Sequence, residues 1–80
     1  MNNEKYLQDV SNELEAAEAS FPPFNSYHEG YAIIQEELDE LWDEVKSKKR
    51  THINLYIEAT QVAAMGVRFM KFVWEKMEGH

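Results

Sequence analysis

Several kinds of residue are rare or absent in this chain of 80 residues, and each absence limits what the protein can be. There is no cysteine, so disulfide bonds are excluded and cysteine usage does not indicate the redox compartment. No apolar run is long enough to span a bilayer, and no basic and then apolar signal peptide opens the chain. We therefore expect a cytoplasmic protein without a membrane partner. No glycine-rich phosphate loop occurs, which excludes P-loop and Rossmann nucleotide sites.

Positive charge is scarce as well, because 8 lysine and arginine residues stand against 15 acidic residues, for a formal net charge of -7. A surface with this balance repels phosphate backbones, which argues against nucleic acid as a partner. The same balance suits a protein that collects cations, although acidity also serves solubility alone.

The length fits one small domain, residues 1–80. A chain this short buries only about 60% of its unfolded surface, and many such domains depend on disulfides, metals or partners. Since disulfides are excluded, oligomerisation and metal binding remain.

Few glycines and prolines interrupt the chain, and its apolar spacing predicts three helices and no strand. The first helix covers roughly residues 4–20 and ends at "FPPFNS", because a residue before proline is pushed out of the helical region. The second begins after Ser26, where "SYHE" is typical of a capping box in which Glu29 reaches back, and it ends at the basic run "KSKKR". The third runs from about Thr51 to Met77. The predicted fold class is all-α, a three-helix chain that forms an oligomeric helical bundle.

The third predicted helix has two mostly apolar faces. One follows Leu55, Glu58, Val62, Met65, Phe69 and Phe72, and the other follows Tyr56, Thr60, Ala63, Val67, Met70 and Trp74. A helix that is apolar on two sides is buried on both. Three helices of one short chain can cover only one of these sides, so we expect the second to contact another subunit of a homo-oligomer.

Acidic residues on the second and third helices form the most informative pattern. Glu37 and Glu40 are three residues apart in "EELDELWDEV", so their side chains emerge close together and repel each other. Glu58 occupies a position that the apolar spacing assigns to the core, where an unpaired carboxylate is costly. If the three converge, they suit a hard divalent ion, Mg²⁺ or Mn²⁺, whose remaining waters substrate phosphates can replace. Alternatively, Glu37 and Glu40 form a helix flank, and Glu58 pairs with a lysine across an interface.

These residues resemble the motifs of the MazG-like family of all-α nucleoside triphosphate pyrophosphohydrolases, which pair E-x-x-E on one helix with E-x-x-D on the next. "EELDEL" matches the first motif through Glu37 and Glu40, and "IEATQV" stands where the second is expected, with Glu58 matching its glutamate. The likeness covers roughly residues 27–75. "HEGYAIIQEELDELWDEV" looks like the short phage and prophage branch, which implies the host cytoplasm if the protein is phage-encoded.

The resemblance implies a helical homodimer or tetramer in which Glu37, Glu40 and Glu58 are the metal-binding and catalytic residues, with Gln61 at the fourth metal position. Such enzymes hydrolyse a nucleoside triphosphate to the monophosphate and pyrophosphate, using metal ions that bridge phosphate oxygens and lower the pKa of an attacking water. Gln61 stands where the family has aspartate, and a neutral amide brings no charge and takes no proton at neutral pH. The runner-up is therefore a catalytically degenerate member that binds or sequesters nucleotides. A third possibility is a structural acidic helical oligomer.

Four further residues are candidates for substrate contact. Lys48 and Lys49 belong to a basic run that could meet phosphates, and the alternative is a solvated turn. Arg68 could contact a phosphate or an acidic residue at an interface. Trp42 could stack on a nucleobase, and the alternative is a place in the core.

Overall fold

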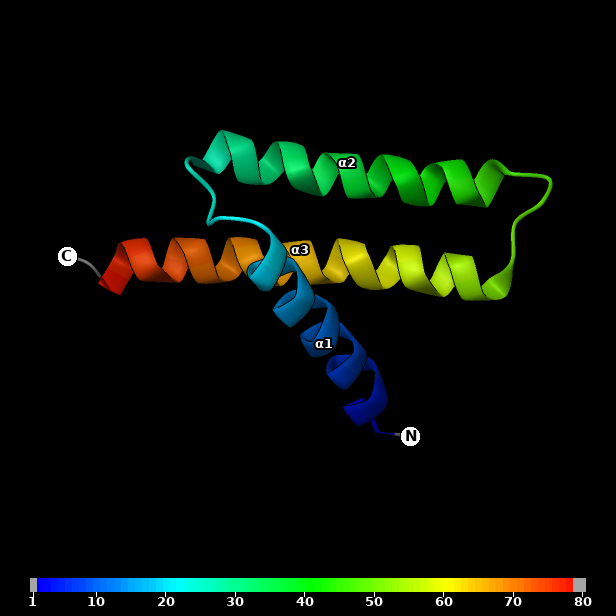
Figure 1. The fold of residues 1–80 in the computed structure, drawn as a ribbon, viewed down its shortest axis with the longest axis horizontal. Helices are drawn as coiled ribbons and strands as arrows, with labels where there is room; N and C mark the ends of the chain where they lie inside the picture. Colours follow the sequence, from blue (N-terminus) through cyan, green and yellow to red (C-terminus); the bar gives the residue numbers. More distant parts are fainter. Residues whose placement is uncertain (1, 79–80) are drawn as a thin grey trace.

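Three α-helices make up the structure, a computed structural model that describes residues 2–78. α1 spans Glu4–Ser20, α2 spans Tyr27–Lys46 and α3 spans His52–Glu78, with no strand among the described residues. The all-α class is confirmed, and the helices begin and end within one residue of the predicted positions. α2 and α3 run antiparallel, and α1 crosses α3 obliquely (Figure 1). None of the three helices, over the residues described, combines the length and hydropathy needed to cross a bilayer.

Short-range hydrogen bonds set the helix ends. α1 stops at Ser20, and Phe21 takes up extended backbone (φ -131°, ψ 145°) ahead of the two prolines. The Ser26 hydroxyl accepts a hydrogen bond from the Glu29 N–H at 3.0 Å, as the predicted capping box requires. The other half of that prediction is wrong, because the Glu29 carboxylate accepts from the backbone N–H (3.0 Å) and the side-chain amide (3.1 Å) of Asn25. Asn25 offers Glu29 two donors where the Ser26 backbone offers one.

α3 is the centre of the molecule, because α1 and α2 both pack on it and, in residues 2–78, do not pack on each other. α2 comes close to α3 at Gly30, where a Cβ would lie 2.7 Å from a ring carbon of Phe69. Beside this point the rings of Phe24 and Tyr27 contact those of Phe69 and Phe72, with centroids 5.5–6.4 Å apart. Packing is therefore concentrated where the connector between α1 and α2 meets the C-terminal half of α3.

Polar contacts fix α1 to α3 near both ends of α1. The Tyr56 hydroxyl donates a hydrogen bond to the Asp9 carboxylate, and Lys71 Nζ donates to the Glu18 carboxylate at 2.6 Å. The apolar face of α1 contributes less than its spacing suggests, since Leu7 is 66% exposed. α1 is thus held by a few side-chain contacts with little buried apolar surface.

One side of the α2–α3 pair is apolar and uncovered in the single chain. We call this side the free face. Its exposed members are Tyr31, Leu38, Trp42 and Val45 of α2 with Ala63, Met70, Trp74 and Met77 of α3. The second apolar stripe predicted on α3 belongs to this face only in part, because Tyr56 and Thr60 border α1 instead.

Candidate metal centre

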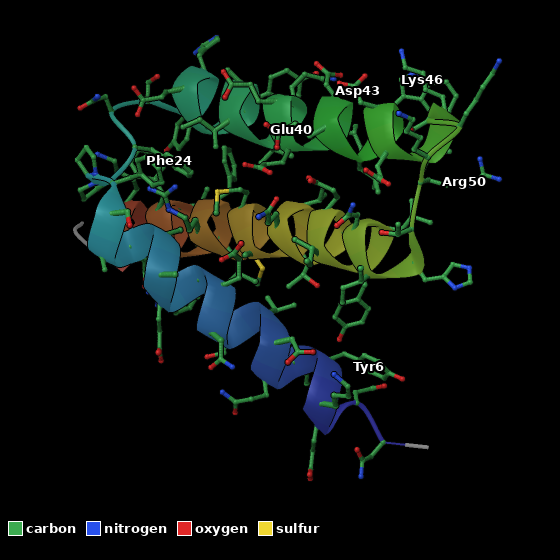
Figure 2. All side chains as sticks on the ribbon, turned by 45° about the vertical axis from the view of Figure 1, so that its right-hand side comes forward. Tyr6, Phe24, Glu40, Asp43, Lys46 and Arg50 are labelled. Carbon is green, nitrogen blue, oxygen red and sulfur yellow. The ribbon has the colours of Figure 1, made fainter. Side chains whose placement is uncertain are left out.

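Three of the carboxylates predicted as metal ligands lie together between α2 and α3, and we call them the acidic cluster. Glu37 and Glu40 project from neighbouring turns of α2, and Glu58 comes from the facing part of α3. One oxygen of each carboxylate lies within 4.8 Å of the others. Figure 2 shows Glu40 on the side of α2 that faces α3. The three-residue spacing on α2 and the antiparallel course of α3 bring the three groups to one level of the helix pair.

The surroundings of Glu37 disfavour its charged form. Its Oε2 atom is buried and has no hydrogen-bond partner among the residues described. The pKa of Glu37 is raised to about 7, and burial is the largest cause. The negative charges of Glu40, Glu58 and Glu13 contribute to this rise, as does the hydrogen bond that a protonated carboxyl can share with Glu40. A cation close to Glu37 would therefore stabilise the charged form of its carboxyl.

The surroundings of Glu58, on α3, disfavour its charged form as well. Its Oε2 atom is also buried without a partner in the described part of the chain. Burial raises the pKa of Glu58, and the charges of Glu40 and Glu44 raise it further. No lysine, arginine or histidine nitrogen lies within 4.0 Å of its carboxylate in residues 2–78. Within one chain the acidic cluster is thus a concentration of uncompensated negative charge.

The donor set of the acidic cluster fits a hard divalent cation. Mg²⁺ and Mn²⁺ prefer carboxylate oxygens and keep part of their water shell when bound to proteins. Glu37, Glu40 and Glu58 could hold such an ion, whose charge would relieve their mutual repulsion and engage the oxygens that lack protein donors.

Gln61 lies beside the acidic cluster, in the wall of a cleft of about 510 Å³. All three helices bound this cleft, and α3 forms its floor between α1 and α2. Glu37 lines the cleft as well, so the acidic cluster and the cleft share a wall. Gln61 therefore shares the cleft wall with Glu37, one of the predicted metal ligands.

Arg68 is a buried cation in the same cleft, with 8% of its surface exposed. Its guanidinium donates hydrogen bonds to the Pro22 carbonyl at 3.1 Å and to Met65 Sδ at 3.5 Å, and it lies 4.4 Å from the ring centroid of Phe24. No carboxylate oxygen lies within 4.0 Å of it in the described chain. Ten residues separate Arg68 from Glu58, which is about 15 Å along α3. Arg68 therefore belongs to the cleft and lies apart from the acidic cluster.

Lys48, Lys49 and Trp42, the other predicted substrate contacts, lie outside both features. Lys48 and Lys49 are exposed in the turn after α2, at the end of the helix pair that lies away from α1 and the first connector (Figure 1). Trp42 is 57% exposed on the free face, so the alternative that places it in the core of the chain is wrong. None of the three lines the cleft.

Sequence reasoning missed the contribution of α1 to the site. Glu13 lines the cleft and its charge helps to raise the pKa of Glu37. Glu13 lies three residues after Val10 and four before Ala17, which places it at the edge of the apolar face of α1. That position was a readable signal that Glu13 points toward another helix. The helix it meets could not be read from the sequence.

Comparison of the chain with protein-family models, with curated proteins and with solved structures finds no match. The geometry of the acidic cluster and cleft, together with the motif resemblance, is therefore the basis for a functional proposal.

Proposed function

We propose that this chain is a MazG-like, magnesium-dependent nucleoside triphosphate pyrophosphohydrolase. The observation that carries the proposal is the acidic cluster, in which Glu37 and Glu58 each bury an unpaired carboxylate oxygen. Uncompensated buried carboxylates are costly, so their convergence from two helices is better explained by a cation than by stability. The Glu37–Glu40 spacing, followed by Glu58 on the next helix, agrees with the order of the family's motifs.

The proposed role of the acidic cluster is to bind the metal ion. Glu37, Glu40 and Glu58 would hold Mg²⁺, which when bound neutralises phosphate charge and acidifies a bound water. The carboxylates would fix the position of such an ion, because they project from two helices that pack directly on each other. The reaction adds water across the linkage between the α and β phosphoryl groups, and it releases a nucleoside monophosphate and pyrophosphate. No protein nucleophile is required.

Gln61 favours a second candidate function, a degenerate family member that binds nucleotides without cleaving them. Its side chain lies beside the acidic cluster, where the family motif has an aspartate. An amide oxygen is a neutral ligand and accepts no proton from water at neutral pH. Loss of this fourth negative charge would weaken metal binding and turnover while the other carboxylates remain.

Incubation with a panel of ribo- and deoxyribonucleoside triphosphates and Mg²⁺ tests both candidates. Release of monophosphate and pyrophosphate, lost in Glu37→Gln and Glu58→Gln, supports the enzyme. Asp39→Asn is the matched control, because Asp39 is an exposed acid on the same helix and lies outside both the acidic cluster and the cleft. Saturable Mg²⁺-dependent binding without cleavage supports the degenerate binder. If the protein neither cleaves nor binds any of the nucleotides, the remaining candidate is an acidic structural protein.

We also propose that the functional form is a homodimer built on the free face. The chain exposes 6253 Å², whereas a compact protein of 9.4 kDa exposes about 5,000 Å². The excess is larger than the roughly 800 Å² that each partner buries in a standard interface. A second copy supplies an apolar surface of the same extent, so two α2–α3 pairs would form a four-helix bundle.

Light scattering at micromolar concentration tests the dimer. Met70→Glu places a charge on the free face and should yield monomer, because Met70 is 68% exposed there. Leu7→Glu is the matched control, since Leu7 is 66% exposed on α1 and lies off the free face. A stable wild-type monomer, or dissociation by Leu7→Glu alone, contradicts the assignment of this face.

A further inference from the structure

We propose that the cleft between α1 and α2 binds a nucleobase, and that Arg68 donates hydrogen bonds to acceptor atoms on the edge of that base. The inference rests on the proposed function, which places the phosphates of the same nucleotide at the acidic cluster. The cleft joins the cluster at Glu37 and Gln61, and its volume of about 510 Å³ lies within the range of small-molecule sites.

Arg68 has hydrogen-bonding capacity that the described residues leave unused. A guanidinium carries five N–H donors in one plane, and two of them meet the Pro22 carbonyl and Met65 Sδ. The remaining donors have no acceptor in residues 2–78. The Phe24 ring covers one face of the group at 4.4 Å, so a ligand reaches it best from within the guanidinium plane. In-plane pairing is the geometry by which arginine contacts the edge of a base.

The charge of the cleft argues that Arg68 meets a neutral group. Four carboxylates and one guanidinium line the cleft, and the acids are Glu13, Glu29, Glu36 and Glu37. A free anion entering this space would be repelled by the net negative charge. A neutral base satisfies both kinds of group, because its acceptors can face Arg68 and its N–H groups can face the carboxylates. Phosphates are better placed at the acidic cluster, where a divalent ion would neutralise them.

The cleft also supplies apolar contacts and the span that a nucleotide needs. Ala17, Ile33 and Met65 line it from α1, α2 and α3 respectively, and such side chains pack against the faces of an aromatic ring. Arg68 lies about 15 Å along α3 from Glu58. The cleft is lined both by Arg68 and by Glu37, which belongs to the acidic cluster. A ligand that fills the cleft can therefore extend from the guanidinium to the cluster.

The donors of Arg68 predict which bases fit. Guanine presents two neighbouring acceptors, O6 and N7, to which two N–H groups of one guanidinium can donate. Adenine presents an exocyclic amino group beside N7, which would set donor against donor. The proposal is therefore selectivity for guanine over adenine.

Binding of nucleosides in chelator tests the proposal apart from metal and catalysis. NMR titrations should give roughly tenfold tighter binding of guanosine than adenosine, the scale of one paired contact to a base edge. Arg68→Gln should weaken guanosine binding about tenfold and remove the selectivity. Lys76→Gln is the matched control, because it removes an exposed cation on the same helix that lies outside the cleft. Equal affinities for guanosine and adenosine, or unchanged guanosine binding in Arg68→Gln, overturn the proposal.

A second pair of variants leaves Arg68 intact in case its replacement disturbs folding. Ala16→Phe fills the cleft from an exposed position on α1 and should abolish nucleoside binding, whereas Ala19→Phe, exposed on α1 outside the cleft, should not. If Arg68 instead binds phosphate, Arg68→Gln weakens binding of inorganic triphosphate with Mg²⁺, which also overturns the proposal. Cleavage of triphosphates by a protein that binds no nucleoside in chelator would refute the base site and leave the proposed function standing.

Discussion

Replacing Glu37 by glutamine should change how the stability of the metal-free protein depends on pH. The folded protein raises the pKa of Glu37 from 4.5 to about 7, so between these values the folded state binds a proton that the unfolded chain does not. The stability associated with this group is therefore complete below about pH 4.5, and it is lost as the pH rises through about 7. Such a shift corresponds to about 3 kcal/mol at most. Partial exposure of Glu37 and solvent screening reduce the expected loss to about 1–2 kcal/mol.

Urea denaturation followed by circular dichroism measures this loss between pH 5 and pH 8. Chelator, ionic strength and protein concentration are held constant, because metal and self-association would also shift the transition. The wild type should lose about 1–2 kcal/mol across this range, and Glu37→Gln should lose less than half as much. Glu36→Gln removes the same charge from the neighbouring exposed position and should keep the wild-type slope. Identical slopes for wild type and Glu37→Gln would refute the reasoning that burial and the neighbouring carboxylates disfavour the charged form of Glu37.

Four further predictions concern the acidic cluster and two glycines of α2 and α3. Glu58→Leu should raise the free energy of unfolding in chelator by about 1–2 kcal/mol, because it removes a buried unpaired carboxylate oxygen. The same change should abolish stabilisation by Mg²⁺. A variant that melts below wild type in chelator, or that Mg²⁺ still stabilises, would contradict the metal-binding role of Glu58. Gln61→Asp should tighten Mg²⁺ binding about tenfold in calorimetric titrations, since it adds a charged oxygen beside the cluster, and equal affinity would mean that position 61 does not face the ion. Gly30→Ala should lower stability by about 1–3 kcal/mol in thermal melts, because its Cβ would lie 2.7 Å from an aromatic ring carbon. Gly66→Ala should raise stability by about 0.5–1 kcal/mol, because alanine favours the helix and its Cβ would meet nothing within 4 Å. Both glycine variants are to be compared in the monomeric Met70→Glu background.

The helices were predictable from sequence because their signals are local. The prolines after Phe21 end α1, and the Ser26 hydroxyl caps α2, so neighbouring residues determine both boundaries. The acidic cluster was also predictable from the spacing of residues along each helix. Glu37 and Glu40 share a helix face by spacing alone, and Glu58 interrupts an apolar stripe.

The position of α1, and with it the cleft, could not be predicted in the same way. Asp9 and Tyr56, whose side chains join α1 to α3, are ordinary residues 47 positions apart, and neither marks the other as a partner. The predicted second stripe of α3 therefore placed Tyr56 on a subunit interface, whereas the structure uses it to hold α1. A buried arginine was also unexpected, because Arg68 is accommodated by Pro22 and Phe24 from a distant connector.

The attachment of α1 has a consequence for the order in which the molecule folds. α2 and α3 are joined by a short turn at residues 47–51, so their pairing closes a small loop. α1 meets α3 only through contacts between residues far apart in the chain, such as Glu18 and Lys71, which are 53 positions apart. Loop-closure entropy favours the local hairpin, so we expect α2 and α3 to pair first and α1 to dock afterwards. During synthesis α1 emerges before the helix on which it rests. The acidic cluster would then exist in a hairpin intermediate, whereas the cleft would appear only at the last step.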